Sequence, residues 1–202
     1  MRVFAFLGLT LFLSACSDAP TETKVKEPEK PPAPISGQRA FQLTYPAARA
    51  WAGDSLPLRI RSINLTDVPS EGGKAGAWEL TYVSPSQQAA RVFTWSAIEA
   101  PGNLHKDIFA GKAQTWSPSS SQEKPFAAAV FRTDTPEALK SGITAAKDFL
   151  DKPGDKPPIN LVAEFTGRFP NPVWLVLWGE TAGLAKYTVF IDAATGQVVG
   201  KS

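Results

Sequence analysis

The sequence predicts an α+β protein made of two tandem α-β-β-β units, each a helix packed on an antiparallel sheet. A helix with one apolar face begins at Asp134, and three strand-like runs follow it. The segment 39–118 shows the same order of patterns less regularly. Trp78 and Trp174 fall at equivalent positions in the two halves, at similar distances from a closing glycine. The repeat therefore predicts units at 39–118 and 125–202.

The start of the chain has the pattern of a secretion signal, which we place at residues 1–15. Arg2 is followed by an apolar run from 3 to 13, which is shorter than the roughly 20 residues that cross a bilayer. Leu13-Ser14-Ala15-Cys16 resembles the lipobox of bacterial lipoproteins. The resemblance implies cleavage between Ala15 and Cys16 and a lipid on the Cys16 sulfur. The alternative is an ordinary secretory signal.

Residues 16–38 are expected to be a lipidated cysteine and a disordered tether. The stretch from Ser17 to Gln38 contains five prolines, alternates Lys with Glu, and has almost no apolar side chains. Such a composition favours an extended spacer, although a ligand for an aromatic groove has a similar composition. Ser17 stands directly after the cysteine. The resemblance to lipoproteins implies that a serine at this position directs the protein to the outer membrane and not to the inner one.

The elements of the first unit follow from local patterns. Tyr45-Pro46 is expected to begin a short helix that ends at Trp51. Alternating apolar residues and turn signals then predict three strands, at 56–64, 77–83 and 91–98. Gly72-Gly73-Lys74 reads as a hairpin turn between the first two of them.

The second unit has clearer signals. Asp134 is a helix cap, Pro136 stands in the first turn, and the apolar positions from 139 to 150 lie on one helical face. The expected strands are 160–165, 173–178 and 187–191, followed by a short run at 197–199. Asp192 to Gly196 reads as a turn in which the Asp caps its own backbone.

The end of the second unit carries a family resemblance. Phe190-Ile191-Asp192-Ala193-Ala194-Thr195-Gly196-Gln197-Val198-Val199 resembles the closing motif of PepSY and PepSY-like domains. The resemblance covers the second half well and the first half approximately, because Glu99-Ala100-Pro101-Gly102 lacks the Thr. It implies a small α+β module outside the cytoplasm that is proposed to bind or restrain peptidases, with no catalytic residues to carry over.

The composition argues against several kinds of chemistry. The 202 residues carry 21 basic and 19 acidic side chains, a net charge of +2, which leaves no footprint for nucleic acid. One Cys and one His exclude disulfide scaffolds, Cys-rich zinc sites and a His-centred triad. His105 reads as a loop residue and Ser119 to Ser121 as a linker between the halves. We therefore expect no metal, no cofactor and no enzyme.

The six tryptophans are numerous for cores of this size. Either all of them fill the cores and the seam between the halves, or some form an aromatic surface for a partner. Trp116 and Trp178 are the candidates for such an interaction surface.

Together these patterns predict a lipid-anchored protein of the cell envelope that faces the periplasm. Its expected partners are the membrane, through the lipid on Cys16, and an envelope protein or peptide that it binds without catalysis, with restraint of a peptidase as one such role. One alternative is a carrier of a small ligand in the concavity between helix and sheet. The other is a hydrolase that uses carboxylates such as Glu164 or Glu180.

Overall fold

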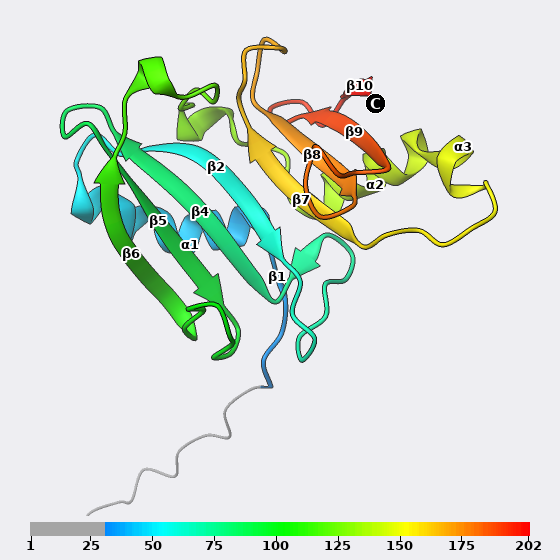
Figure 1. Cartoon of the computed structure of the whole chain (residues 1–202), viewed down its shortest axis with the longest axis horizontal. Coiled ribbons are helices and arrows are strands. Elements are labelled where there is room, and N and C mark those ends of the chain that lie inside the picture. Colours follow the sequence, from blue (N-terminus) through cyan, green and yellow to red (C-terminus); the bar gives the residue numbers. More distant parts are fainter. Residues whose placement is uncertain (1–30) are drawn as a thin grey trace, which may run out of the picture. The chain divides into compact units, whose positions relative to one another are not determined.

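One antiparallel sheet of eight strands runs through both halves of the chain, in the order β10-β9-β8-β7-β2-β4-β5-β6 (Figure 1). The computed structural model describes residues 31–202. The predicted signal peptide, Cys16 and the tether up to residue 30 lie outside the described residues. The long strands of the first half are β2 (Leu56–Ile63), β4 (Ala77–Ser84), β5 (Ala89–Ser96) and β6 (Asp107–Thr115). Those of the second are β7 (Ile159–Glu164), β8 (Val173–Trp178), β9 (Tyr187–Asp192) and β10 (Val198–Lys201).

The remaining elements are short strands and helices. A two-stranded sheet pairs β1 (Ile35–Ser36) with β3 (Lys74–Ala75). The α-helices are α1 (Gly37–Trp51), α2 (Thr135–Ala145) and α3 (Lys147–Leu150). Two 3-10 turns, η1 (Pro118–Ser120) and η2 (Ala128–Val130), lie on the segment that joins the halves.

The predicted fold class, two α-β-β-β units each with its own sheet, is wrong. β2 and β7 pair antiparallel, with Arg59 opposite Glu164 and Arg61 opposite Val162, so the strands of both halves form one sheet. Two separate sheets would each have left an additional edge with unpaired backbone groups, and the β2–β7 pair removes both. The predicted domains 39–118 and 125–202 belong to one compact unit, Pro32–Ser202.

Two elements of the first half differ from the expectation. α1 begins at Gly37 and not at Tyr45, because the Ser36 hydroxyl accepts a hydrogen bond from the Arg39 amide and caps the helix there. The predicted tether 16–38 is therefore too long at its C-terminal end. β6 was not expected, because most of its side chains are exposed at the edge of the sheet and its sequence lacks apolar alternation.

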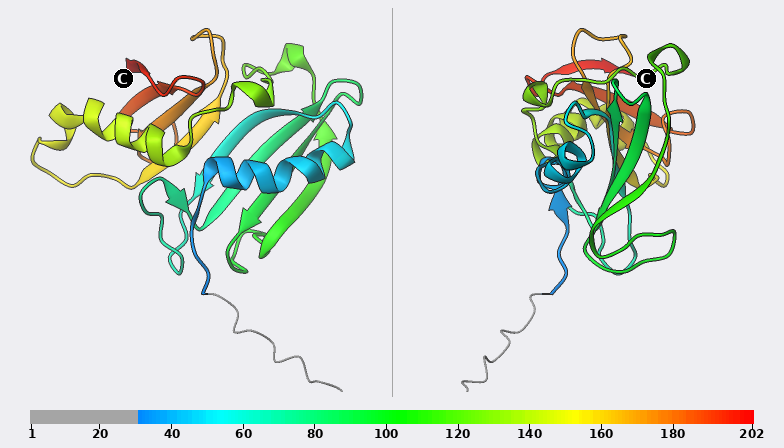
Figure 2. Two further views of the ribbon diagram at one scale, coloured as in Figure 1. Left: turned by 180° about the vertical axis from the view of Figure 1, so that it is seen from behind. Right: turned by 90° about the vertical axis from the view of Figure 1, so that its left-hand side faces the viewer.

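Both long helices lie on the same face of the sheet (Figure 2). α1 packs on β2, β4 and β5, and α2 packs on β8, β9 and β10. Alternate residues along each strand point to this helix face. The fully buried ones are large, and they include Trp78, Tyr82, Trp174 and Trp178. The principal hydrophobic core is thus a layer between the helices and the sheet that continues across both halves.

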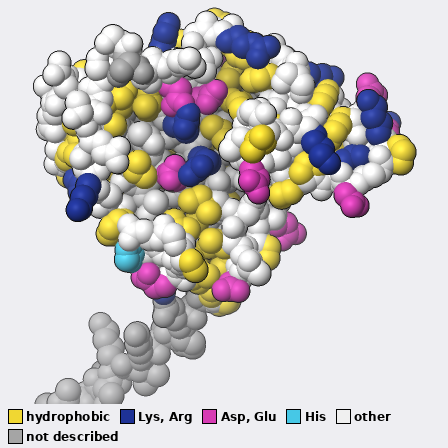
Figure 3. Space-filling view, viewed as in Figure 1, with side chains coloured by type: hydrophobic (Ala, Val, Ile, Leu, Met, Phe, Trp, Pro, Cys, Tyr) yellow, Lys and Arg dark blue, Asp and Glu magenta, His cyan; other side chains and the backbone are white. Residues whose placement is uncertain are grey.

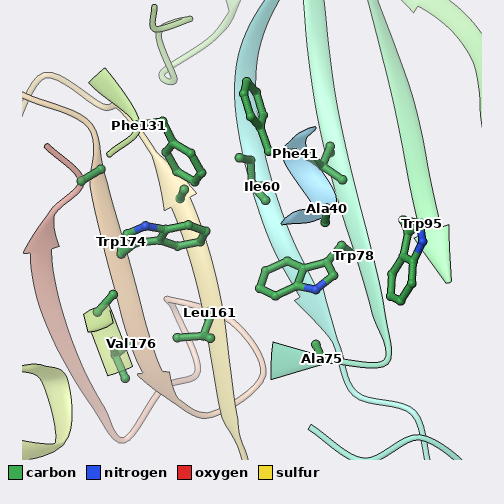
Figure 4. Packing of buried hydrophobic residues seen from close by; sticks show 14 of the residues in the cluster. Ala40, Phe41, Ile60, Ala75, Trp78, Trp95, Phe131, Leu161, Trp174 and Val176 are labelled. Carbon is green, nitrogen blue, oxygen red and sulfur yellow. The ribbon is translucent and has the colours of Figure 1, made fainter. Parts of the chain in front are cut away.

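Two tryptophans meet in the middle of this core. The rings of Trp78 and Trp174 pack edge to face with their centroids 6.4 Å apart (Figure 4). Each indole Nε1 donates a hydrogen bond of 2.9 Å to a carbonyl just before a helix, Trp78 to Ile35 and Trp174 to Thr133. Both tryptophans therefore pack between helix and sheet, and the pair also joins the halves.

The N-termini of the two helices meet above the tryptophans and share their caps. The Asp134 carboxylate accepts hydrogen bonds from the amides of Thr135 in α2, at 2.7 Å, and of Gln38 in α1, at 3.0 Å. The Thr135 hydroxyl accepts from the Gly37 amide at 2.9 Å. One negative charge therefore faces the positive ends of two helix dipoles. A Cβ on Gly37 would lie 2.8 Å from both Trp174 and Thr135, so only glycine fits this junction.

Asp134→Ala is expected to lower the free energy of unfolding by about 2 kcal/mol, because one substitution removes capping acceptors from two helices. Urea unfolding followed by tryptophan fluorescence measures the loss. Asp155→Ala, an exposed loop position, is the matched control. A loss no larger than that of the control would contradict the shared cap.

Candidate functional site

We call the face of the sheet opposite α1 and α2 the open face, because no α-helix of the described residues 31–202 lies over it (Figure 1). In Figure 3, which shows this face, acidic and basic side chains gather near its middle. Strand alternation places them there: Ile60 points into the helix-side core, while its neighbours Arg59 and Arg61 point to the open face. This combination makes the open face the candidate functional site.

Apolar side chains flank the charged centre on both sides. On β7, β8 and β9 they form a cluster that Phe169 and Ala185 cover from two loops, and its members are Val162, Val173, Leu175, Leu177 and Phe190. On the first half Trp116 covers Leu58 and Val83. The open face thus has apolar clusters at both flanks and charged side chains along its middle.

Two ion pairs hold the arginines of β2. Arg61 lies opposite Glu79 in the β2–β4 register, and its guanidinium is 3.0 Å from the Glu79 carboxylate. Arg59 forms its salt bridge with Glu123, which lies on the segment between β6 and α2. Both arginine side chains remain more than two-fifths exposed, so these pairs shape the site more than they stabilise the fold.

Glu164 is the unusual charge of this face. It lies directly opposite Arg59 in the β2–β7 register, yet within residues 31–202 its carboxylate makes no hydrogen bond or salt bridge, because the Arg59 guanidinium pairs with Glu123. Burial raises the pKa of Glu164 above its ordinary value, and the nearby positive charge of Arg59 offsets this only in part. A half-buried carboxylate without a partner is what a ligand-binding position often contains.

Two adjoining cavities form what we call the central groove. The Glu164 cavity, about 250 Å³, has Glu164 and Glu180 on its walls and Val162, Leu175 and Leu177 beneath them. The loop residues 181–183 form another side of it. The Thr94 cavity, about 520 Å³, crosses towards β4 and β5. Arg61 and Glu180 line both cavities, so the two adjoin.

The Thr94 cavity lies where the β2–β7 ladder ends. Beyond Arg61 the strands separate, and side chains replace the ladder: the Ser62 hydroxyl accepts a hydrogen bond from the Leu161 amide at 2.9 Å. Asn160 donates to the Gly179 carbonyl at 2.7 Å, which fixes the start of the loop that carries Glu180. The Thr94 hydroxyl is buried and has no hydrogen-bond partner among residues 31–202.

A third cavity lies on the helix side of the sheet. It has a volume of about 380 Å³ and is lined by Leu65, Leu139, Ile159 and Leu161, at the edge of the core beside α2. A further cavity, of about 520 Å³, lies between α2 and the start of β10, with Ser141 and Val198 among its lining residues. Buried side chains fill the middle of the interface between the helices and the sheet. The small-ligand alternative therefore has these edge cavities in place of the expected concavity.

Trp116 and Trp178 do not form an interaction surface. Trp178 is 1% exposed and packs against Phe149 and Tyr187 on the helix side, and Trp116 is 8% exposed against Leu58 and Val83. The hypothesis of an exposed aromatic patch at these two positions is wrong, because the single sheet has cores on both faces and each core takes up an indole.

Several other residues lie where the sequence predicted. Asp192 accepts hydrogen bonds from the amides of Ala194 and Thr195, so its turn is structural. Burial tends to raise the pKa of Asp192, but these amides and Asn171 outweigh it and hold the pKa below its ordinary value. His105 lies in a loop and contacts Glu99. Gly72-Gly73 forms the expected turn, and Ser119 to Ser121 lie on the connection between the halves.

Most of the groove was not predicted from the sequence. Glu164 and Glu180 were singled out, and the structure brings them into one cavity. Arg59 and Arg61 occupy polar positions of the predicted strand 56–64, and their alternating charges, with Glu79 on the next strand, were an available signal. No such signal marks Glu123 or Thr94 in the sequence, because their roles depend on tertiary packing.

Comparison with protein-family models, with curated proteins and with solved structures gave no match to this chain. Within the described range 31–202, no helix is long and apolar enough to cross a membrane. The same residues contain no group of three or more His, Cys, Asp or Glu side chains that could hold a metal ion.

Glu164→Gln is expected to stabilise the fold at pH 7. The pKa of Glu164 is higher in the folded chain than its ordinary value of 4.5. The wild type therefore loses stability as the pH rises from 4.5 through the pKa of the folded chain. The variant carries no charge and keeps that stability. Thermal unfolding midpoints should therefore be higher for the variant at pH 7 and equal below about pH 4. A lower midpoint at pH 7 would show that attraction to Arg59 exceeds the cost of burial.

Proposed function

We propose that this chain is a lipid-anchored binding protein of the cell envelope that holds a peptide or protein segment in the central groove, without catalysis. The observation that carries the proposal is the asymmetry of the sheet. Both long helices cover one face, while the other has two adjoining cavities with charged walls, an apolar floor and a buried hydroxyl without a partner in the described chain. Such a mixture of apolar and polar surface is typical of a recognition site.

Two further features support the proposal. The groove crosses several strands, from β7 and β8 to β4 and β5, so its length suits a chain segment better than a compact small molecule. The resemblance to PepSY-like domains points the same way, since that family is proposed to bind or restrain peptidases. Restraint of an envelope peptidase, by holding one of its loops in the groove, is the specific form of the proposal.

Selection from a random peptide library, with the full chain purified in detergent as the target, is expected to yield peptides that bind in the groove. Ala182 lines the Glu164 cavity from an exposed loop, so Ala182→Trp should fill the cavity and abolish binding. Ala50→Trp, at an exposed site on α1, should bind like wild type. Failure to select any peptide, or equal binding by Ala182→Trp, would contradict the proposed groove.

The anchor is tested separately. Cys16→Ala removes the only thiol, so the variant should no longer take up lipid and should leave the membrane fraction or keep its signal peptide. Labelling with a radioactive fatty acid and membrane fractionation measure both effects. Unchanged labelling and fractionation would refute lipidation at Cys16.

A second candidate function is hydrolysis, because Glu164 and Glu180 converge on one cavity. A carboxyl group with a raised pKa suits a general acid, and a second carboxylate beside it can serve as base or nucleophile. Turnover of a panel of chromogenic glycosides, lost in both Glu164→Gln and Glu180→Gln, would support this function over simple binding. Absence of turnover across the panel would count against it.

A further inference from the structure

The Glu164 cavity combines two kinds of surface that few ligands match. Its floor is apolar, since Val162, Leu175 and Leu177 point into it from β7 and β8 and are at most 8% exposed. Its walls carry two carboxylates, Glu164 from the end of β7 and Glu180 from the loop after β8. A complementary ligand has an aliphatic stem for the floor and a positive tip for the walls.

The charges around this cavity are unevenly satisfied. Arg59 and Arg61 also line it, and each guanidinium pairs through Nη2 with a carboxylate, that of Glu123 or Glu79, while its buried Nε has no hydrogen-bond partner among residues 31–202. The carboxylates of Glu164 and Glu180 make no salt bridge or hydrogen bond within residues 31–202. Because each arginine is neutralised by its own carboxylate partner, Glu164 and Glu180 leave the cavity with a net negative charge. A carboxylate that loses hydration without gaining a partner lowers stability, and a cation would supply that partner.

We propose that the Glu164 cavity binds the side chain of a lysine or arginine carried by the segment that lies in the central groove. The inference rests on the proposed function and deepens it. The methylene stem of the side chain lies on Val162, Leu175 and Leu177, and its charged end lies between Glu164 and Glu180. This basic residue is the anchor that fixes the register of the segment.

An observation independent of the carboxylates also points to a bound segment. Thr94 is 8% exposed and lines the adjoining cavity, and its hydroxyl has no hydrogen-bond partner in the described part of the chain. Buried hydroxyl groups are normally paired. The backbone of a segment that leaves the Glu164 cavity and crosses β2 passes over this cavity, where its amides and carbonyls offer such a partner.

The test uses the peptides selected on the wild-type chain. They are expected to be enriched in one Lys or Arg position, and replacing that residue by norleucine, which keeps the stem and removes the charge, should weaken binding about tenfold. Glu164→Gln should weaken the basic peptide by a similar factor, while Asp155→Asn, which removes one exposed charge elsewhere, should leave its Kd unchanged. Glu180→Gln should have a smaller effect, about two- to threefold, because Glu180 is exposed.

The double-mutant cycle completes the test. The norleucine peptide should bind wild type and Glu164→Gln equally, since the interaction is already absent. A folding defect cannot imitate this result, because Glu164→Gln is expected to be the more stable protein at pH 7. Peptides that bind in the groove with no basic preference would overturn this inference and leave the proposed function standing. The absence of any groove-binding peptide would overturn both.

Discussion

The rest of the structure depends on the junction where the N-termini of α1 and α2 meet. Asp134 and Thr135 cap both helices, and Trp78 and Trp174 pack edge to face beneath them while donating hydrogen bonds to the segments that lead into the helices. These contacts need both helices on the same face of the sheet. They also hold the two halves together, because the β2–β7 ladder that joins them is short.

The arrangement of the groove follows from this junction. Arg59 and Glu164 come from strands 105 positions apart in the chain, and only the β2–β7 pairing places them opposite each other. Since Arg59 pairs with Glu123, the carboxylate of Glu164 is left without a salt bridge in the described chain, and its burial raises its pKa. Glu164→Gln is therefore expected to stabilise the fold and to weaken binding. Such a trade-off is typical of a residue that serves function at a cost in stability. The groove and the helix junction lie on opposite faces of the same central strands.

Local signals in the sequence predicted much of the secondary structure. The cap at Asp134, the strand at 173–178 and the turn at Asp192 all occur as expected, because each depends on neighbours in the chain. The joining of the halves into one sheet was not predictable in this way, since strand alternation specifies which face a residue points to and not which strand lies beside it. The same limit hid the burial of Trp116 and Trp178, and it hid the partners of Arg59 and Arg61.

The most direct test of the account is to locate a bound peptide by methyl NMR. Leu175 and Leu177 on β8 point to the open face, while Val176 between them points to α2. Addition of a selected peptide should shift the methyl resonances of Leu175, Leu177 and Val162 and leave those of Val176 and Leu139 nearly unchanged. Largest shifts at Val176 and Leu139, or at the edge strands β6 and β10, would contradict the claim that the open face is the binding surface.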